Sequence, residues 1–163
     1  MNEQRIADLD QLDIQILRLY QRDTQTPAHL IAERVGLSAA AVQRRLKRMR
    51  DTGAIQREIA QIDPQAVGLE VTCIVSVDIE RERHAHVEQF ARRMQDYPEV
   101  QQCYFVTGQT DFILVVLARD MEHYKAFTGR ALSDENVRSF TTHVVLERSK
   151  VGLTLPLDSL RRE

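Results

Sequence analysis

The sequence predicts an α+β protein of two domains: an N-terminal helix-turn-helix domain, simple or winged, followed by a ferredoxin-like βαββαβ domain. Two observations support this fold class. Apolar residues recur at helical spacing in three segments between residues 10 and 52, and the chain then alternates between strand and helix periodicity up to residue 146. Asp63-Pro64 and Gly68 lie between these parts and are typical of a hinge. We expect the first domain over residues 1–54, a linker strand or hinge over 55–68 and the second domain over 69–163.

The composition is that of an ordinary globular protein. The chain has 163 residues, of which 43% are hydrophobic, so it can bury the core of one full domain or of two small ones. It contains no run of roughly 18 apolar residues, the length that spans a membrane. Residues 1–13 lack the apolar core of a signal peptide. We therefore expect a cytoplasmic protein with no membrane partner.

Local signals set the borders of the three expected N-terminal helices. Asp10 can cap the first helix. Thr26-Pro27 marks the start of the second helix, because a capping residue is followed by proline at the first helical position. Gly36 ends this helix, since glycine readily adopts the left-handed conformation that closes a helix. Ser38 then caps a third helix that runs to about Thr52.

The third helix carries the charge pattern of a DNA-reading helix. Although the net charge of the chain is −2, residues 38–52 hold five Lys or Arg and one Asp. Val42, Leu46 and Met49 recur at i, i+4 and i+7 and predict its buried stripe. A helix fits the major groove, and small residues near its start allow close approach to base edges. The expected DNA-contacting residues are Ser38, Ala40, Ala41, Gln43, Arg44, Arg45, Lys47 and Arg48.

Side-chain length divides these residues by expected role. Gln43 and Arg44 can hydrogen-bond bases, whereas Lys47, Arg48 and Arg45 are suited to phosphates. If four cations per monomer each neutralise a phosphate, the logarithm of a dimer's affinity falls against the logarithm of salt concentration with a slope on the order of −7. The alternative is a solvated basic face in a helical bundle, since amphipathic helices often carry charge outward. The caps and the intervening turn favour the DNA-reading interpretation.

The second half predicts the βαββαβ order. Its expected elements are a strand over 71–79, a helix around 87–94, a strand over 100–107, a strand over 112–118, a helix over 120–132 and a strand over 137–146. The strand over 112–118 is an unbroken apolar run, which implies burial on both faces. One monomer has few helices with which to cover two faces of a sheet. We therefore expect Tyr104 and Phe105 to pack in the sheet or in a dimer interface.

Short signatures occur in order along both halves. The first half contains Leu9-Asp10-x-x-Asp13-x-x-Ile16-Leu17, Val35-Gly36-Leu37-Ser38, Arg45-x-x-Arg48-Met49 and Gly53-x-Ile55. The second half contains Asp63-Pro64, Gly68, Pro98-x-Val100, Val106-Thr107-Gly108-x-x-Asp111 and Val144-Val145-Leu146. Together they resemble the Lrp/AsnC family, the feast/famine regulators of bacteria and archaea, over essentially the whole chain. The resemblance implies a transcriptional regulator that binds double-stranded DNA, forms dimers that assemble to tetramers or octamers, and responds to an amino acid or related small effector.

The turn from Gly108 to Asp111 is the candidate effector site. By resemblance, Gly108, Gln109, Thr110 and Asp111 line a pocket between dimers, and Thr142 from a neighbouring final strand contributes to it. The residues themselves allow two interpretations. Backbone N–H groups at Gly108 and the Asp111 carboxylate could hold the two charged ends of an amino acid. Alternatively, this is a simple hairpin turn in which Asp111 caps backbone amides.

Two other functions are compatible with the same fold. Sirohaem decarboxylases of haem biosynthesis resemble these regulators but do chemistry. The sequence shows no nucleophile with a base, no phosphate-cradling loop and no clustered acid pair, so we expect no catalytic residue, no metal site and no cofactor beyond a possible amino-acid effector. The second alternative is an effector-binding module without DNA binding. The three alanines after Ser38, where the family often has proline or a hydroxyl residue, keep the operator preference open.

Overall fold

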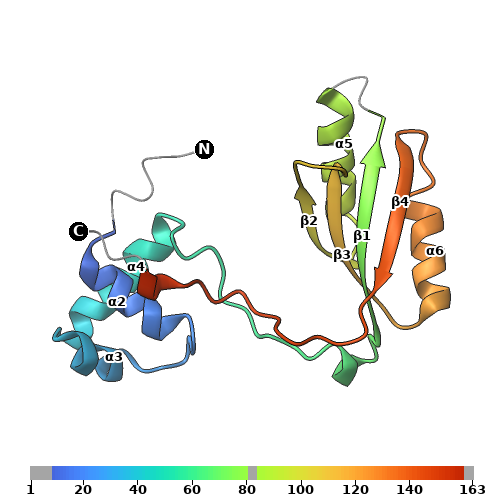
Figure 1. Cartoon of the computed structure of the whole chain (residues 1–163). Coiled ribbons are helices and arrows are strands. Elements are labelled where there is room, and N and C mark those ends of the chain that lie inside the picture. The colour runs from blue at the N-terminus through green and yellow to red at the C-terminus, as the bar shows by residue number, and fades with distance from the viewer. Residues whose placement is uncertain (1–8, 81–83, 160–163) are drawn as a thin grey trace. The chain divides into compact units, whose positions relative to one another are not determined.

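The structure, a computed structural model, describes residues 9–80 and 84–159. Its contacts divide the chain into two compact units (Figure 1): a helical unit of Met1–Ala60 with Val151–Glu163, and a second unit of Gln61–Lys150. The expected outer ends of the domains, at residues 1 and 163, lie outside the described residues. No helix in the described part of the chain is long and apolar enough to cross a membrane.

Three helices form the helical unit: α2 (Gln11–Tyr20), α3 (Ala28–Val35) and α4 (Ala39–Asp51). Their apolar stripes meet in one core, because each stripe repeats at helical spacing. That core contains Ile16, Tyr20, Ile31, Ala32, Val35, Val42, Leu46 and Met49. The predicted helix-turn-helix is therefore confirmed, with α3 and α4 joined by a short turn at Gly36.

Side-chain and glycine caps end these helices. Asp10 and Asp13 form a capping box at the start of α2, each carboxylate accepting the other residue's backbone N–H. Gly36 closes α3 with φ 69°, as expected. The start of α3 differs from the expectation, because Pro27 is the N-cap and the helix begins one residue later. The Thr26 hydroxyl donates to Asp23 Oδ2 at 3.2 Å instead of capping α3.

The second unit has the predicted βαββαβ order. Its elements are β1 (Val71–Ile79), α5 (His84–Gln95), β2 (Val100–Phe105), β3 (Phe112–Ala118), α6 (Met121–Ala131) and β4 (Val137–Val144). The strands form one antiparallel sheet in the order β2-β3-β1-β4. Side chains of α5 and α6, including Phe90 and Phe127, share one core with Val75 and Leu114. Both helices therefore cover the same face of the sheet.

The opposite face of the sheet carries an apolar patch on β1, β2 and β3 that no helix of the described chain covers. Burial alternates along β3, so that Phe112 and Leu114 are buried while Ile113 and Val115 are only half-buried. Ile74, which pairs with Val115, is 40% exposed, and Tyr104, which pairs with Ile113, is 51% exposed. The expected burial of β3 on both faces is therefore not met within one chain, because α5 and α6 cover only one side.

The segments that connect the two units have little regular structure. Residues 56–63 form an extended connector rather than a strand, and a 3-10 turn (Gln65–Val67) follows it. Residues 151–163 were expected in the second domain, but the described part of this segment, residues 151–159, belongs to the helical unit. The reason is packing: Leu157 is buried, Arg18 of α2 donates to its carbonyl, and Gln21, directly after α2, donates to the carbonyl of Leu155.

Candidate nucleic-acid interface and effector-binding turn

The helix α4 presents a small and cationic surface to solvent. Ser38 Oγ accepts the N–H of Ala41 at 3.2 Å and so fixes the first turn of the helix. Val42, Leu46 and Met49 face the core, as the sequence predicts. The side chains that follow Ser38 on the outer face are exposed at Ala40, Gln43, Arg44, Lys47 and Arg48, and half-buried at Ala41 and Arg45.

A buried carboxylate of α2 holds two of the arginines of α4. Asp13 is fully buried, and its Oδ1 lies 2.8 Å from Arg45 Nη1, while its Oδ2 pairs with Arg48. Arg45 Nη1 also lies 2.6 Å from Asp10 Oδ2. The hydrogen bonds to Asp13 and Asp10 raise the pKa of Arg45, so its charge is fixed. The structure thus directs two of the expected phosphate contacts, Arg45 and Arg48, toward α2.

Sequence reasoning missed this ion-pair cluster, although a signal for it is present. Asp13 lies three residues before Ile16 and seven before Tyr20, on the face of α2 that is buried. A carboxylate on a buried stripe requires a cationic or hydrogen-bonding partner. The arginines of the cationic helix α4, which packs against α2, could have been predicted as that partner.

A third arginine of α4 holds the beginning of the connector. Arg50 Nε lies 2.7 Å from Glu58 Oε1, and Arg50 Nη2 donates to the Tyr20 hydroxyl at 2.7 Å. Tyr20 in turn donates to Glu58 Oε1 at 2.7 Å. These hydrogen bonds lower the pKa of Glu58, the bond from Tyr20 contributing most. Arg44 and Lys47 are left as the α4 cations that form no ion pair with any residue the structure describes.

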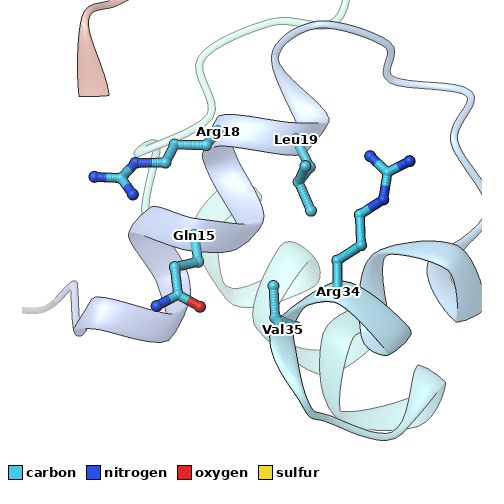
Figure 2. A pocket seen from close by; sticks show the side chains of 5 residues that line it. All are labelled: Gln15, Arg18, Leu19, Arg34 and Val35. Atoms are coloured by element: carbon cyan, nitrogen blue, oxygen red, sulfur yellow. The ribbon is translucent and has the colours of Figure 1, made fainter. Parts of the chain in front are cut away.

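A shallow pocket of about 260 Å³ lies between α2 and α3 (Figure 2). Gln15, Arg18 and Leu19 of α2 and Arg34 and Val35 of α3 line it. Leu19 and Val35 point toward each other, whereas the Arg18 side chain extends away from them in Figure 2. No residue that the sequence predicts to contact DNA lines this pocket.

In the second unit, the Gly108–Asp111 turn rests on the end of β1. Thr110 Oγ1 donates to the Val77 carbonyl at 2.9 Å, and the Asp111 N–H donates to the same carbonyl at 3.1 Å. Asp111 is buried, and its Oδ2 accepts the N–H of Ile79 at 3.0 Å. This bond corresponds to the backbone-capping interpretation of Asp111. Gly108 (φ 125°) and Gln109 are exposed, with nothing within 4 Å of a Cβ placed on Gly108.

Thr142 lies on the helix-covered side of the sheet. It pairs with Val75 in the middle of β1, and its Oγ1 is 2.5 Å from the hydroxyl of Tyr124 on α6. The turn contacts Val77 and Ile79, which lie further along β1. Within one chain, Thr142 and the turn therefore occupy different positions along the same strand.

The fold and these surfaces define a class of protein: a helix-turn-helix DNA-binding protein with an appended α/β domain. Comparison with known sequences gives the family. Residues 9–50 match the AsnC-type helix-turn-helix domain, and residues 72–154 match the Lrp/AsnC ligand binding domain. The chain belongs to the Lrp/AsnC family of transcriptional regulators.

Several relatives are similar over nearly their whole length. An uncharacterized HTH-type transcriptional regulator of Sinorhizobium fredii is 40% identical over 93% of this chain and 90% of its own. The regulator AldR of Mycobacterium tuberculosis is 33% identical over 88% of this chain and 80% of its own. Among solved structures, an AsnC family regulator from Agrobacterium tumefaciens is 31% identical, with a TM-score of 0.86 over 94% of this chain and 100% of its own. A regulator from Neisseria meningitidis, solved as an L-Met complex, is 32% identical, with a TM-score of 0.86 over 94% of this chain and 99% of its own.

Proposed function

We propose that this regulator reads DNA with the outer face of α4, and that Lys47 and Arg44 carry the contacts to phosphates. This moves Arg44 from the base-contacting role that its length suggested, because two of the three expected phosphate contacts are paired with Asp13. The observation that supports this is the division of the α4 cations: Arg45, Arg48 and Arg50 are paired within the helical unit, whereas Arg44 and Lys47 are exposed. Unpaired cations on a helix that fits the major groove can neutralise phosphates without first breaking an internal ion pair. Ala40 and Gln43 lie beside them and face the bases.

Arg45 and Arg48 act mainly by orienting α4 in this proposal. Their bonds to the buried Asp13 fix the rotation of α4 against α2, which sets where Gln43 and Arg44 point. Arg48, whose side chain is 49% exposed, retains surface from which it can also reach a phosphate. DNA binding would then place the protein in the cytoplasm of its cell.

The effector proposed for the second unit is an amino acid or a related small molecule. The matched domain is a ligand-binding domain, and one solved relative is an L-Met complex. The exposed backbone at Gly108 and Gln109 is the part of the turn that can receive a carboxylate, because Asp111 Oδ2 already caps Ile79. Thr110 and Asp111 would then shape the turn, and Thr142 would contribute from a neighbouring chain.

Assembly through the open face of the sheet completes the proposal. Ile74, Tyr104, Ile113 and Val115 give this face an apolar surface that a second copy can cover. The resulting dimer would carry two copies of α4, and its further assembly to a tetramer or octamer would set how many of them engage DNA together. Regulation, rather than catalysis, is the activity proposed, since the similar proteins carry the names of regulators.

Selection of genomic DNA fragments by the purified chain, with and without a panel of amino acids, tests this function. We expect a shared sequence in the bound fragments, and a change in affinity or in native mass with at least one amino acid. A matched protein with Lys125→Ala, an exposed lysine of α6, should select the same fragments. Failure to enrich any fragment would contradict DNA reading, and the absence of any amino-acid effect would contradict effector sensing alone.

A further inference from the structure

The end of the described chain is held against α2 by a specific set of contacts. The Gln21 side-chain amide, directly after α2, bonds both ways with the backbone of Leu155: its Nε2 donates to the carbonyl at 3.1 Å, and its Oε1 accepts the N–H at 3.0 Å. These two hydrogen bonds hold the backbone of Leu155 in the way that a neighbouring β-strand would. Arg18 Nη2 donates to the Leu157 carbonyl at 2.8 Å, and Arg18 Nε lies 3.2 Å from Asp158 Oδ1.

An apolar anchor accompanies these polar contacts. Val151, Leu153, Leu155 and Leu157 alternate along the segment, and only Leu157 is buried, with 7% of its surface exposed. Leu153 is 73% exposed. Leu157 is thus packed through its side chain and hydrogen-bonded through its carbonyl. These two kinds of contact distinguish a docked segment from a chain end that merely lies on a surface.

From these contacts we infer that residues 155–158 are a structural part of the helical unit. They form a second tether between that unit and the sheet of the second unit. The first tether is the connector that leads from α4 to β1. The second leaves the sheet from β4, the strand next to β1: Val144 pairs with Cys73, and the Val145 N–H donates to the Thr72 carbonyl at 2.9 Å. Both tethers thus leave the sheet from the same end of two paired strands.

The docked segment is also connected to α4 through contacts of α2. Arg18 and Gln21, which hold the segment, lie on and directly after the helix that carries Asp13, and Asp13 holds Arg45 of α4. The chain therefore links β4 to α2 through the docked segment, and the Asp13 ion pair links α2 to α4. Hydrogen-bonded and packed elements of this kind carry coupling between distant sites.

Hydrogen exchange of the full chain tests the docking, using two substitutions in the same segment. Leu157→Asp places a charge in the buried position, whereas Leu153→Asp places the same charge at an exposed one. We expect amides of α2 to exchange about tenfold faster in Leu157→Asp and to be unchanged in Leu153→Asp, because release of the segment lowers the local opening free energy of α2. Arg18→Met, which keeps the helix but removes the guanidinium, should act like Leu157→Asp. Unchanged α2 exchange in both Leu157→Asp and Arg18→Met would overturn the inference.

DNA affinity provides the readout for the tether, and it rests on the proposed function. On fragments that the unaltered chain selects, Leu157→Asp should weaken binding about tenfold while Leu153→Asp leaves it unchanged, because a looser unit presents its reading helix at a lower effective concentration. Equal affinities of the two variants would contradict the tether. If the unaltered chain bound no DNA, the proposed function would fail, and the exchange experiment would still decide the docking.

Discussion

Asp13 Oδ1 lies 2.8 Å from Nη1 of Arg45, which joins α2 to the cationic helix α4. The carboxylate is fully buried, and only 24% of the Arg45 side chain is exposed. Water therefore screens this pair far less than a surface ion pair. This ion pair fixes α4 against α2. The cations of α4 therefore fall into two groups: those that position the helix and those that face outward.

The substitution Asp13→Asn should destabilise the helical unit by about 3 kcal/mol, because it removes the buried countercharge of Arg48 and leaves Arg45 with Asp10 alone. Urea unfolding followed by helical circular dichroism measures the effect. Asp51→Asn, at an exposed position of α4, is the matched control and should change the unfolding midpoint little. Equal midpoints for the two variants would contradict a structural role for the Asp13 carboxylate.

The salt dependence of DNA binding should report the cations that are free to meet phosphates. With Arg44 and Lys47 alone, a dimer neutralises four phosphates, which gives a slope of about −4 rather than the −7 expected from four cations per monomer. Arg44→Ala should reduce the magnitude of the slope by about 2 and leave thermal stability unchanged. Arg45→Ala should instead lower stability. A slope near −7 that both substitutions reduce equally would show that Arg45 leaves Asp13 to bind DNA.

Stability at acid pH should depend on Glu99 and Arg130. Burial raises the pKa of Glu99, but bonds from its own backbone N–H and from Arg130, whose Nη2 lies 2.5 Å from Oε1, outweigh burial and lower the pKa below its ordinary value of 4.5. The stabilisation is therefore present above about pH 4.5 and is lost as the pH falls through the lowered folded pKa.

Arg130→Ala removes the guanidinium that helps to lower the pKa of Glu99, while the bonds from the Glu99 backbone N–H and from His123 remain. Because 56% of the Arg130 side chain is exposed, water screens the pair, and we expect a loss on the order of 1 kcal/mol near pH 7. The loss should shrink below about pH 4.5, measured as urea midpoints from pH 7 down to about pH 3. Lys125→Ala, on the same helix, is the control. A loss that is constant with pH would contradict the role of the Glu99 charge.

Assembly should depend on the open face of the sheet. Ile74→Glu places a charge in the middle of this face and should reduce the native mass to that of a monomer, because the charge would be buried without a partner on association. Leu146→Glu adds the same charge at a residue that is 98% exposed and should leave the mass unchanged. Native mass spectrometry distinguishes the two. An unaltered oligomer in Ile74→Glu would place the interface elsewhere.

Periodicity and caps are local properties, and for that reason they predicted the three helices, the βαββαβ order and the buried stripe of Val42, Leu46 and Met49. Local sequence patterns did not predict the tertiary contacts. Asp13 and Arg45 lie 32 residues apart, and only the packing of α2 against α4 brings them together. Leu157 resembles Leu153 and Leu155 in sequence, and its burial depends on where α2 lies.

The candidate effector turn shows the same limit. Gly108 and Asp111 predicted a tight turn in β-structure, and the turn is present. The chemistry of Asp111 depended on β1, because the N–H of Ile79 that its Oδ2 accepts comes from a strand 32 residues earlier. The apolar run of β3 predicted burial on both faces, but the helices α5 and α6 cover one side only, and the residues of the other side are half-buried.

The most direct test of the central claim is the DNA affinity of the double variant Arg44→Ala/Lys47→Ala, measured by fluorescence anisotropy on fragments that the unaltered chain selects. Both side chains are exposed and form no ion pair with the residues that the structure describes, so the unfolding midpoint should stay the same. The predicted result is a loss of affinity of about a hundredfold or more, from the four phosphate contacts that a dimer would give up. An affinity equal to that of the unaltered chain would contradict the assignment of α4 as the DNA-reading helix.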